Sequence, residues 1–181
     1  MMKTTTLSLK ALTFSAALCA SLGLSLSANA ETIEVQKLKH AGPYPVATPW
    51  MADSVNVKGE KFSMEGVLDS PLSFTLLNNG KEVAASQLLA DSKQNAIHLA
   101  SFTVSNTSRT KVTIEVKGLK QYRLFVDGEQ VTVNGDKAET TLMPSSHTVV
   151  IKYLTESSDK DFKISITAAD GKQLSVGESA A

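Results

Sequence analysis

Histidine is the side chain that most often serves as a general base or a metal ligand near neutral pH. The chain has three, His40, His98 and His147, which lie far apart and show neither H-x-H nor H-x-x-x-H spacing. His147 also alternates with apolar residues on an expected strand. We interpret all three as packed or hydrogen-bonded structural histidines, and a role in binding or catalysis is the alternative.

Two S-x-x-K spacings could pair a nucleophilic serine with a lysine, as in penicillin-recognising enzymes. They are Ser108 to Lys111 and Ser157 to Lys160. Both fall in expected turns between strands, and no K-T-G or S-D-N motif accompanies them. The chain also lacks a G-x-S-x-G elbow, a glycine-rich phosphate loop and an E-x-x-H pair, so the sequence predicts no catalytic residue.

Metal and thiol chemistry are not indicated either. Asp159 and Asp161 resemble a fragment of a calcium loop, but the glycine and the terminal glutamate of such a loop are missing. The only cysteine, Cys19, lies in a segment that we expect to be removed. The mature chain would then have no disulfide and no thiolate. We expect neither a metal nor a cofactor.

Two aromatic residues are the candidates for ligand binding. Tyr44 and Trp50 lie in a proline-rich segment, where both rings could be exposed together. An exposed ring offers an apolar face with a polar edge, which suits a sugar or a peptide. For Trp50, the only tryptophan, the alternative is that it caps one end of the core. Any binding is expected to be independent of metal.

The elements that would position these residues are strands with explicit turns. Asp127-Gly128 and Asn134-Gly135 favour tight hairpins, because both residues of each dipeptide tolerate positive φ. Residues 147–154 are apolar on both faces, which predicts a central strand. Between residues 111 and 154, strands are predicted at 112–117, 122–126, 131–133 and 147–154.

The remaining chain is less regular but also mostly extended. The segment 41–50 carries three prolines and is expected to be an extended or edge segment that docks as a loop. Residues 82–91 fit a helix and a strand equally well. Further strands or hairpins are predicted at 31–39, 54–64 around Lys58-Gly59, 72–76 before Asn78-Asn79-Gly80, 97–104, 162–166 and 174–176, with turns at 106–109 and 170–171.

Strand phase predicts which side chains are buried. Ile114, Val149, Ile151 and Ile164 occupy the apolar phase and are expected in the core, whereas Lys117 and Lys152 are expected at the surface. Together these patterns predict a single all-β domain, an antiparallel β-sandwich of the jelly-roll type, at residues 31–176. Residues 177–181 would be a tail or a linker cut short.

Residues 1–30 have the pattern of a cleaved signal peptide. Lys3 and Lys10 precede an apolar stretch, and Ala28-Asn29-Ala30 supplies a cleavage site before Glu31. A membrane anchor would need about 20 strongly apolar residues, and serines interrupt this stretch. A lipoprotein signal would need a small residue before Cys19, where the chain has leucine. We expect an exported protein, periplasmic, outer-surface or extracellular, with no membrane span after cleavage.

The charge balance bears on possible partners. The chain has 18 basic and 18 acidic residues, and removal of the signal peptide takes two lysines and no acid, which leaves a net charge of −2. Charges of both signs are interspersed, as on a solvated surface. No nucleic-acid partner is expected.

Four stretches together carry a resemblance to a known family. They are Ala41-Gly42-Pro43-Tyr44, a short hairpin near Val57-Lys58-Gly59, the run from Leu119 to Val131 that contains the V-D-G hairpin, and the run from Leu142 to Tyr153 with the pattern L-x-P-x-x-H. In this order they resemble accessory jelly-roll domains of the PA14 or galactose-binding-like type, as found at the N-terminus of secreted Bacteroidetes hydrolases and peptidases. The chain departs from the family in Ser145-Ser146, where a glycine is common, and in lacking the paired acids that hold calcium.

The resemblance implies a secreted accessory or recognition module that is not itself catalytic and that binds a glycan or a peptide, or acts with a larger exported enzyme. One alternative is that the chain is the N-terminal part of a peptidase or glycosidase whose active site lies beyond residue 181. Another is a small periplasmic structural or adhesion protein.

Overall fold

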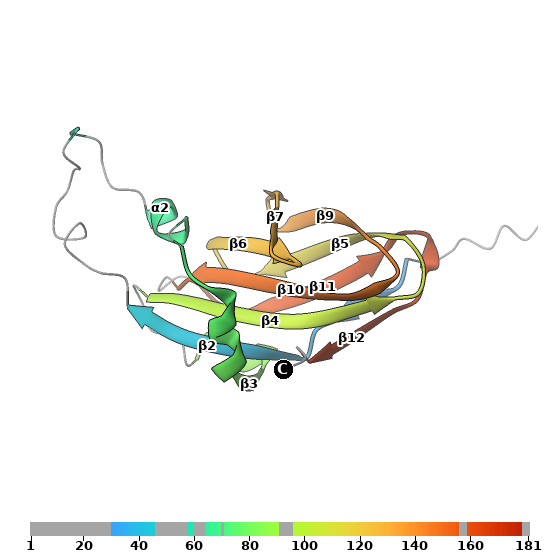
Figure 1. Ribbon diagram of the computed structural model, residues 1–181, viewed down its shortest axis with the longest axis horizontal. Helices are drawn as coiled ribbons and strands as arrows, with labels where there is room; N and C mark the ends of the chain where they lie inside the picture. Colours follow the sequence, from blue (N-terminus) through green and yellow to red (C-terminus); the bar gives the residue numbers. More distant parts are fainter. Residues whose placement is uncertain are drawn as a thin grey trace, which may run out of the picture.

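Two antiparallel β-sheets face each other and enclose the core (Figure 1). This computed structural model describes residues 30–45, 58–59, 64–69, 71–90, 96–155 and 159–178. The antiparallel all-β sandwich predicted by the sequence is confirmed. Sheet A has five strands in the order β1 (Thr32–Glu34), β11 (Lys163–Ala168), β5 (Thr110–Lys117), β9 (Lys137–Leu142) and β8 (Val133–Asn134).

Sheet B has seven strands and is built around β4 and β10. Its order is β3 (Lys81–Ala84), β2 (Lys37–Pro45), β4 (Ala96–Asn106), β10 (Ser145–Leu154), β6 (Gln121–Val126) and β7 (Glu129–Val131). The seventh strand, β12 (Leu174–Glu178), pairs with the end of β4 that β2 leaves open. Because β12 ends at Glu178, regular pairing continues two residues past the expected end of the domain at 176.

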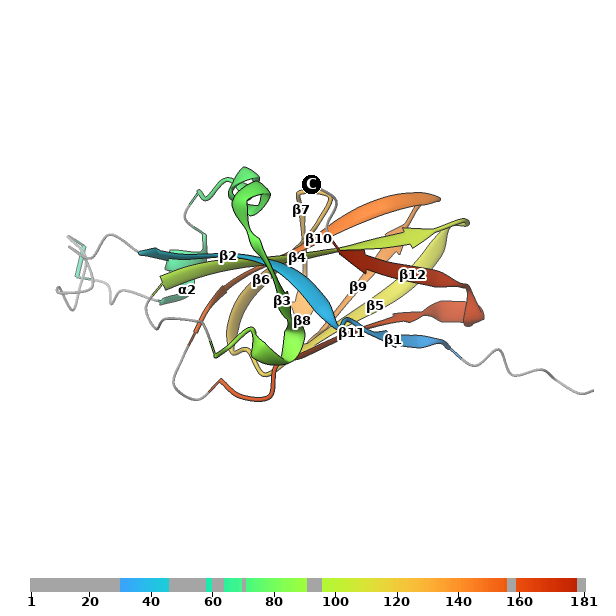
Figure 2. The ribbon, with the colours of Figure 1, turned by 90° about the horizontal axis from the view of Figure 1, so that it is seen from below.

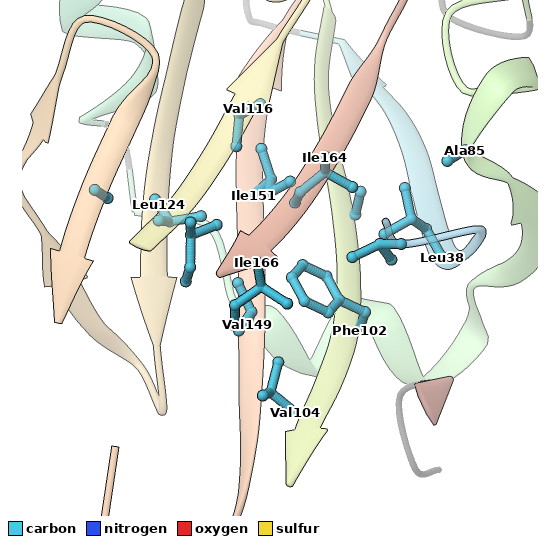
Figure 3. Close-up of a cluster of buried hydrophobic side chains, with 14 of the residues drawn as sticks. Leu38, Ala85, Phe102, Val104, Val116, Leu124, Val149, Ile151, Ile164 and Ile166 are labelled. Carbon is cyan, nitrogen blue, oxygen red and sulfur yellow. The ribbon is translucent and has the colours of Figure 1, made fainter. Parts of the chain in front are cut away.

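The core lies between the inward faces of the two sheets. Figure 3 shows Phe102 of β4 beside Ile166 of β11, so the two sheets meet directly there. The four predicted core residues are confirmed, since each has no exposed surface. They are Ile114, Val149, Ile151 and Ile164.

Strand β10 is apolar on both faces because the outer side of sheet B is covered as well. Val150 packs with Leu77 of the 3₁₀ helix η1 (Phe74–Asn79), and Leu154 packs with Leu68 of helix α2 (Met64–Leu68). Figure 2 shows η1 on the side of β2 and β4 that faces away from sheet A. The prediction of a central strand is therefore confirmed.

Lys152 does not follow the prediction of a surface position. It lies on the outer face of β10, beneath the covering segments, and only 3% of it is exposed. The strand phase was right, but the sequence did not show that this face is covered. Lys117, at the end of β5, is exposed as expected.

Residues 41–45 of the proline-rich segment belong to a strand rather than to a docked loop, and residues 46–50 lie outside the described residues. Strand β2 continues through Pro43 to Pro45 and pairs with β4, with a bulge between Ala41 and Tyr44. On its other side β3 pairs only with Lys37–His40, so both prolines lie where β3 does not pair with β2. For residues 41–45, the prediction of an extended edge is thus right and that of a loop is wrong. Prolines are tolerated there because β3 does not pair with this part of β2 and so does not need their missing N–H groups.

Several turn and element predictions differ from the structure in detail. Residues 74–79 form η1 rather than a strand, because the Ser73 side chain accepts a hydrogen bond from the Thr75 amide and caps the helix. Of the segment 82–91, the described residues 82–90 contain both expected types in succession, strand β3 and then the 3₁₀ helix η2 (Ala85–Gln87). A further short 3₁₀ helix, η3 (Ala169–Gly171), marks the predicted turn before β12.

The two predicted hairpin dipeptides have different outcomes. Asp127 and Gly128 form the turn between β6 and β7, with φ of 51° and 85°, as predicted. The second turn is centred on Gly135 and Asp136, one residue later than expected, and leads into β9, which was not predicted. The proposed hairpin at 54–64 lies outside the described residues, except for the turn at Lys58-Gly59 and Met64, where α2 begins.

Candidate functional site

Tyr44, the predicted ligand-binding residue that the structure describes, lies at a groove beside the open edge of β2. The groove exists because β3 begins only opposite His40 and does not pair with Ala41–Pro45. Its volume is about 490 Å³. The residues that line this groove, called the β2 groove below, are His40, Ala41, Gly42, Pro43, Tyr44, Asn79, Lys81 and Val83.

The β2 groove offers side chains of mixed chemistry. Pro43, Asn79 and Lys81 are exposed, so a ring, an amide and an ammonium group are open to a ligand. Tyr44 is only partly exposed, because it packs against both apolar clusters on the outer face of sheet B. Pro43 and Pro45 have no N–H to donate, so this edge is poorly suited to pairing with an added strand. Recognition in the β2 groove therefore has to come mainly from side chains.

Behind the groove, three aromatic rings stack in the interior. The His40 Nε2 and His98 Nδ1 atoms are 3.2 Å apart, and His98 stacks on Tyr153 with the ring centres 5.2 Å apart. His98 and Tyr153 have no exposed surface, and His40 is 9% exposed. The sequence did not reveal this cluster, because 58 residues separate the two histidines and only the pairing of β2 with β4 brings them together.

The Asp127 turn is fixed by a histidine from the neighbouring strand. The Asp127 Oδ2 atom is 2.6 Å from His147 Nδ1, and Asp127 Oδ1 accepts a hydrogen bond of 2.9 Å from the Thr148 amide. His147 Nε2 lies 2.7 Å from the Met143 carbonyl oxygen, to which it can only donate. Both imidazole nitrogens thus face acceptors, which favours the doubly protonated ring. We call this arrangement the Asp127–His147 clamp.

The pKa shifts of the clamp follow from this geometry. Burial lowers the pKa of His147, but the hydrogen bonds to Asp127 and Met143 outweigh it and raise the pKa above its usual 6.5. Burial raises the pKa of Asp127, but the hydrogen bonds from His147 and Thr148 outweigh it and lower the pKa. Both nitrogens of His147 are engaged within the fold, as the prediction of a hydrogen-bonded histidine requires.

The S-x-x-K spacings do not form a site in the described part of the chain. The Ser108 carbonyl oxygen accepts hydrogen bonds from Asn106 and Thr110, which shapes the turn between β4 and β5. Lys111 forms an ion pair of 2.7 Å with Glu139 on β9. Ser157 and the second predicted ligand residue, Trp50, lie outside the described residues.

Within the described ranges, no group of three or more histidine, cysteine, aspartate or glutamate side chains is arranged to hold a metal ion. None of the helices in those ranges is long and apolar enough to cross a membrane.

Comparison with protein-family models gives no match for this chain, and comparison with curated proteins gives none either. The resemblance to PA14-type or galactose-binding-like domains therefore stays a prediction.

Proposed function

We propose that the protein is a recognition module that is not itself catalytic, an exported β-sandwich that binds a glycan or a peptide in the β2 groove. One observation carries the proposal. The predicted ligand residue Tyr44 lies in a groove of about 490 Å³, within the usual size range of small-ligand sites, together with an exposed amide and an exposed ammonium group.

The arrangement fits binding better than bond cleavage. Asn79 and Lys81 can donate hydrogen bonds to hydroxyl or carbonyl oxygens of a ligand, while Pro43 and Tyr44 offer ring surface. The imidazole nearest to the groove, that of His40, points its Nε2 to His98 rather than to a nucleophile. Export is part of the proposal and depends on residues 1–30 of the sequence.

Binding of a glycan and peptide panel, measured with and without EDTA, tests the proposal. We expect at least one ligand whose affinity is unchanged by EDTA and falls about tenfold in Lys81→Ala, as for the loss of one charge-assisted hydrogen bond. Trp50→Ala tests the second predicted ligand residue in the same assay. The matched control is Lys163→Ala, which removes an exposed lysine from sheet A and should leave affinity unchanged.

Two results would contradict the proposed function. One is turnover of peptide or glycoside substrates by the purified protein. The other is binding that EDTA abolishes and that Lys81→Ala and Trp50→Ala leave unaltered.

A further inference from the structure

A hairpin joins β7 and β8 to β9, and this hairpin is open at one end. The short strand β8 pairs with the first two residues of β9, Lys137 and Ala138. Beyond them, the described strands show no pairing between β7 and β9. The two strands diverge because β7 pairs with β6 in sheet B, whereas β9 pairs with β5 in sheet A. We call the space between them the hairpin mouth.

The hairpin mouth is large enough for a short stretch of extended chain. Its volume is about 550 Å³. The part of β9 that β8 leaves unpaired runs from Glu139 to Leu142, and four residues of a strand span about 13 Å. The long walls of the mouth are residues 129–132 and residues 139–143.

Strand β9 directs main-chain groups into the mouth. In an antiparallel pair, successive residues point their N–H and C=O groups alternately toward the partner strand and away from it. The Asp136 carbonyl oxygen accepts a hydrogen bond from the Val116 amide of β5, so every second residue from Asp136 onward faces β5. The N–H and C=O groups of Glu139 and Thr141 therefore point away from β5 and into the mouth.

Strand β7 presents main-chain groups from the opposite wall. Glu129 lies directly across from Val126 of β6, on the two sides of the two-residue turn Asp127-Gly128. Residues that flank such a turn exchange main-chain hydrogen bonds, so Glu129 faces β6. By alternation, the N–H and C=O groups of Gln130 point away from β6 and toward β9. Both walls thus offer donors and acceptors at the spacing of a strand.

Side chains contribute less to the mouth than the main chain does. Asp127 and Glu139 line it, but they already form ion pairs, with His147 and Lys111 respectively. Met143 also lines the mouth, and with 58% exposure it is the one large apolar side chain so open among the described residues. A matching ligand therefore supplies main-chain donors and acceptors first and an apolar side chain second.

We propose that the hairpin mouth binds an extended segment of another protein, which adds as a strand antiparallel to β9 and hydrogen-bonds to Glu139 and Thr141. A peptide strand carries N–H and C=O groups at the same repeat as both walls, and a glycan does not. A second copy of the folded protein fits less well, because its edge strands carry a sheet beside them and the mouth has walls on two sides. The mouth is separate from the β2 groove, so this proposal does not depend on the proposed function.

Titration with a capped peptide and its backbone-methylated version, followed by NMR, tests the main-chain contact. The probe is acetyl-Thr-Val-Thr-Val-Thr-amide, and the methylated version has its three central amide nitrogens methylated, so that both edges lose donors. The probe should shift the amide signals of Glu139 and Thr141, and the methylated version should bind at least about tenfold more weakly. Equal affinity of the two peptides for the parent protein would overturn the proposal without any variant.

Variants then assign the contact to the edge of β9. Thr141→Pro removes an N–H that points into the mouth and keeps the pairing with β5, so affinity should fall about fivefold, as for one hydrogen bond. Thr141→Val keeps that N–H and should bind like the parent. Affinity that is unchanged in Thr141→Pro would overturn the proposal.

Glu34→Pro is the matched control for Thr141→Pro. The Val35 amide donates to Ile164 and the Glu31 carbonyl accepts from Ala168, so by alternation the Glu34 N–H points away from β11 at the edge of sheet A. Its loss should leave peptide affinity unchanged, and a fall equal to that in Thr141→Pro would overturn the proposal.

Sedimentation of the protein without peptide tests the second copy as occupant. We expect the same sedimentation for the parent and for Thr141→Pro. A dimer of the parent that Thr141→Pro dissociates would assign the mouth to a second copy and would also overturn the proposal.

Discussion

At the scale of single residues, the Asp127–His147 clamp makes stability depend on pH. The folded state raises the pKa of His147. The contribution of His147 to the free energy of unfolding is therefore fully present below its unfolded pKa of about 6.5, and it is lost as pH rises through the folded pKa. Because the folded state lowers the pKa of Asp127, its contribution is present above about 3.8 and is lost as pH falls through the folded pKa. The clamp therefore stabilises the fold most between these two values.

Replacement of His147 should remove this dependence on its alkaline side. We expect His147→Gln to lower the free energy of unfolding by about 1 kcal/mol near pH 5.5 to 6, and by less at pH 9. The expected loss is small because the Asp127 side chain is half-exposed and solvent screens the ion pair. Denaturant unfolding at several pH values measures this. Asp127→Asn should show the same loss, and a difference between parent and His147→Gln that stays constant from pH 5.5 to 9 would contradict the clamp.

The residue scale also shows what sequence spacing could not reveal. The structural role of His147 could be inferred from its place on a strand, but its partner Asp127 is 20 residues away and was noted only for its turn. The His40–His98 contact and the buried Lys152 depend on which strands pair and which face is covered. Neither fact is encoded in local patterns.

At the scale of elements, the predicted strands were those with strong alternation. Strand β5 carries large apolar residues at every second position, whereas the missed strand β9 buries only Ala138 and Leu142. Its other positions are polar, so no apolar periodicity marks it. The misassigned η1 has the opposite problem, because Leu72, Phe74 and Leu76 imitate strand alternation while packing as a cover on sheet B.

The turn after β5 provides a stringent test of an element boundary. Gly118 has a φ of 88°, and an added Cβ would lie 2.4 Å from the Lys160 carbonyl oxygen and 2.8 Å from the Phe162 backbone. We expect Gly118→Ala to lower the free energy of unfolding by about 2 kcal/mol or more beyond the cost of the φ strain alone.

Gly128→Ala is the matched control for Gly118→Ala. Gly128 has a similar φ of 85°, but an added Cβ meets nothing within 4 Å. Its cost should therefore be the backbone strain of about 1 kcal/mol. Thermal or denaturant unfolding of both variants gives the difference. Equal losses for the two would show that the 159–162 segment moves aside and does not fix the end of β5.

At the scale of the whole molecule, the outer cover of sheet B extends to the β2 groove through Tyr44. Tyr44 packs against both outer clusters, one with Phe74 and Phe125 and the other with Leu68. The β2 groove therefore lies at the open edge of β2, next to the covered face of sheet B. The all-β class could be predicted from turns and alternation, but the covering of one sheet by short helices could not.

The predicted cleavage after Ala30 can be compared with the contacts of the N-terminal strand. The Glu31 carbonyl oxygen accepts a hydrogen bond from the Ala168 amide, and Ile33 packs against the main core. Cleavage after Ala30 keeps both contacts, so we expect the exported protein to start at Glu31, which mass spectrometry can measure. A lipid-modified start at Cys19 would contradict this.

A chain shortened to begin at Val35 should lose about 1 to 2 kcal/mol of stability, because it uncovers the edge of β11 and loses the burial of Ile33. A chain that begins at Thr32 keeps β1 and should lose much less.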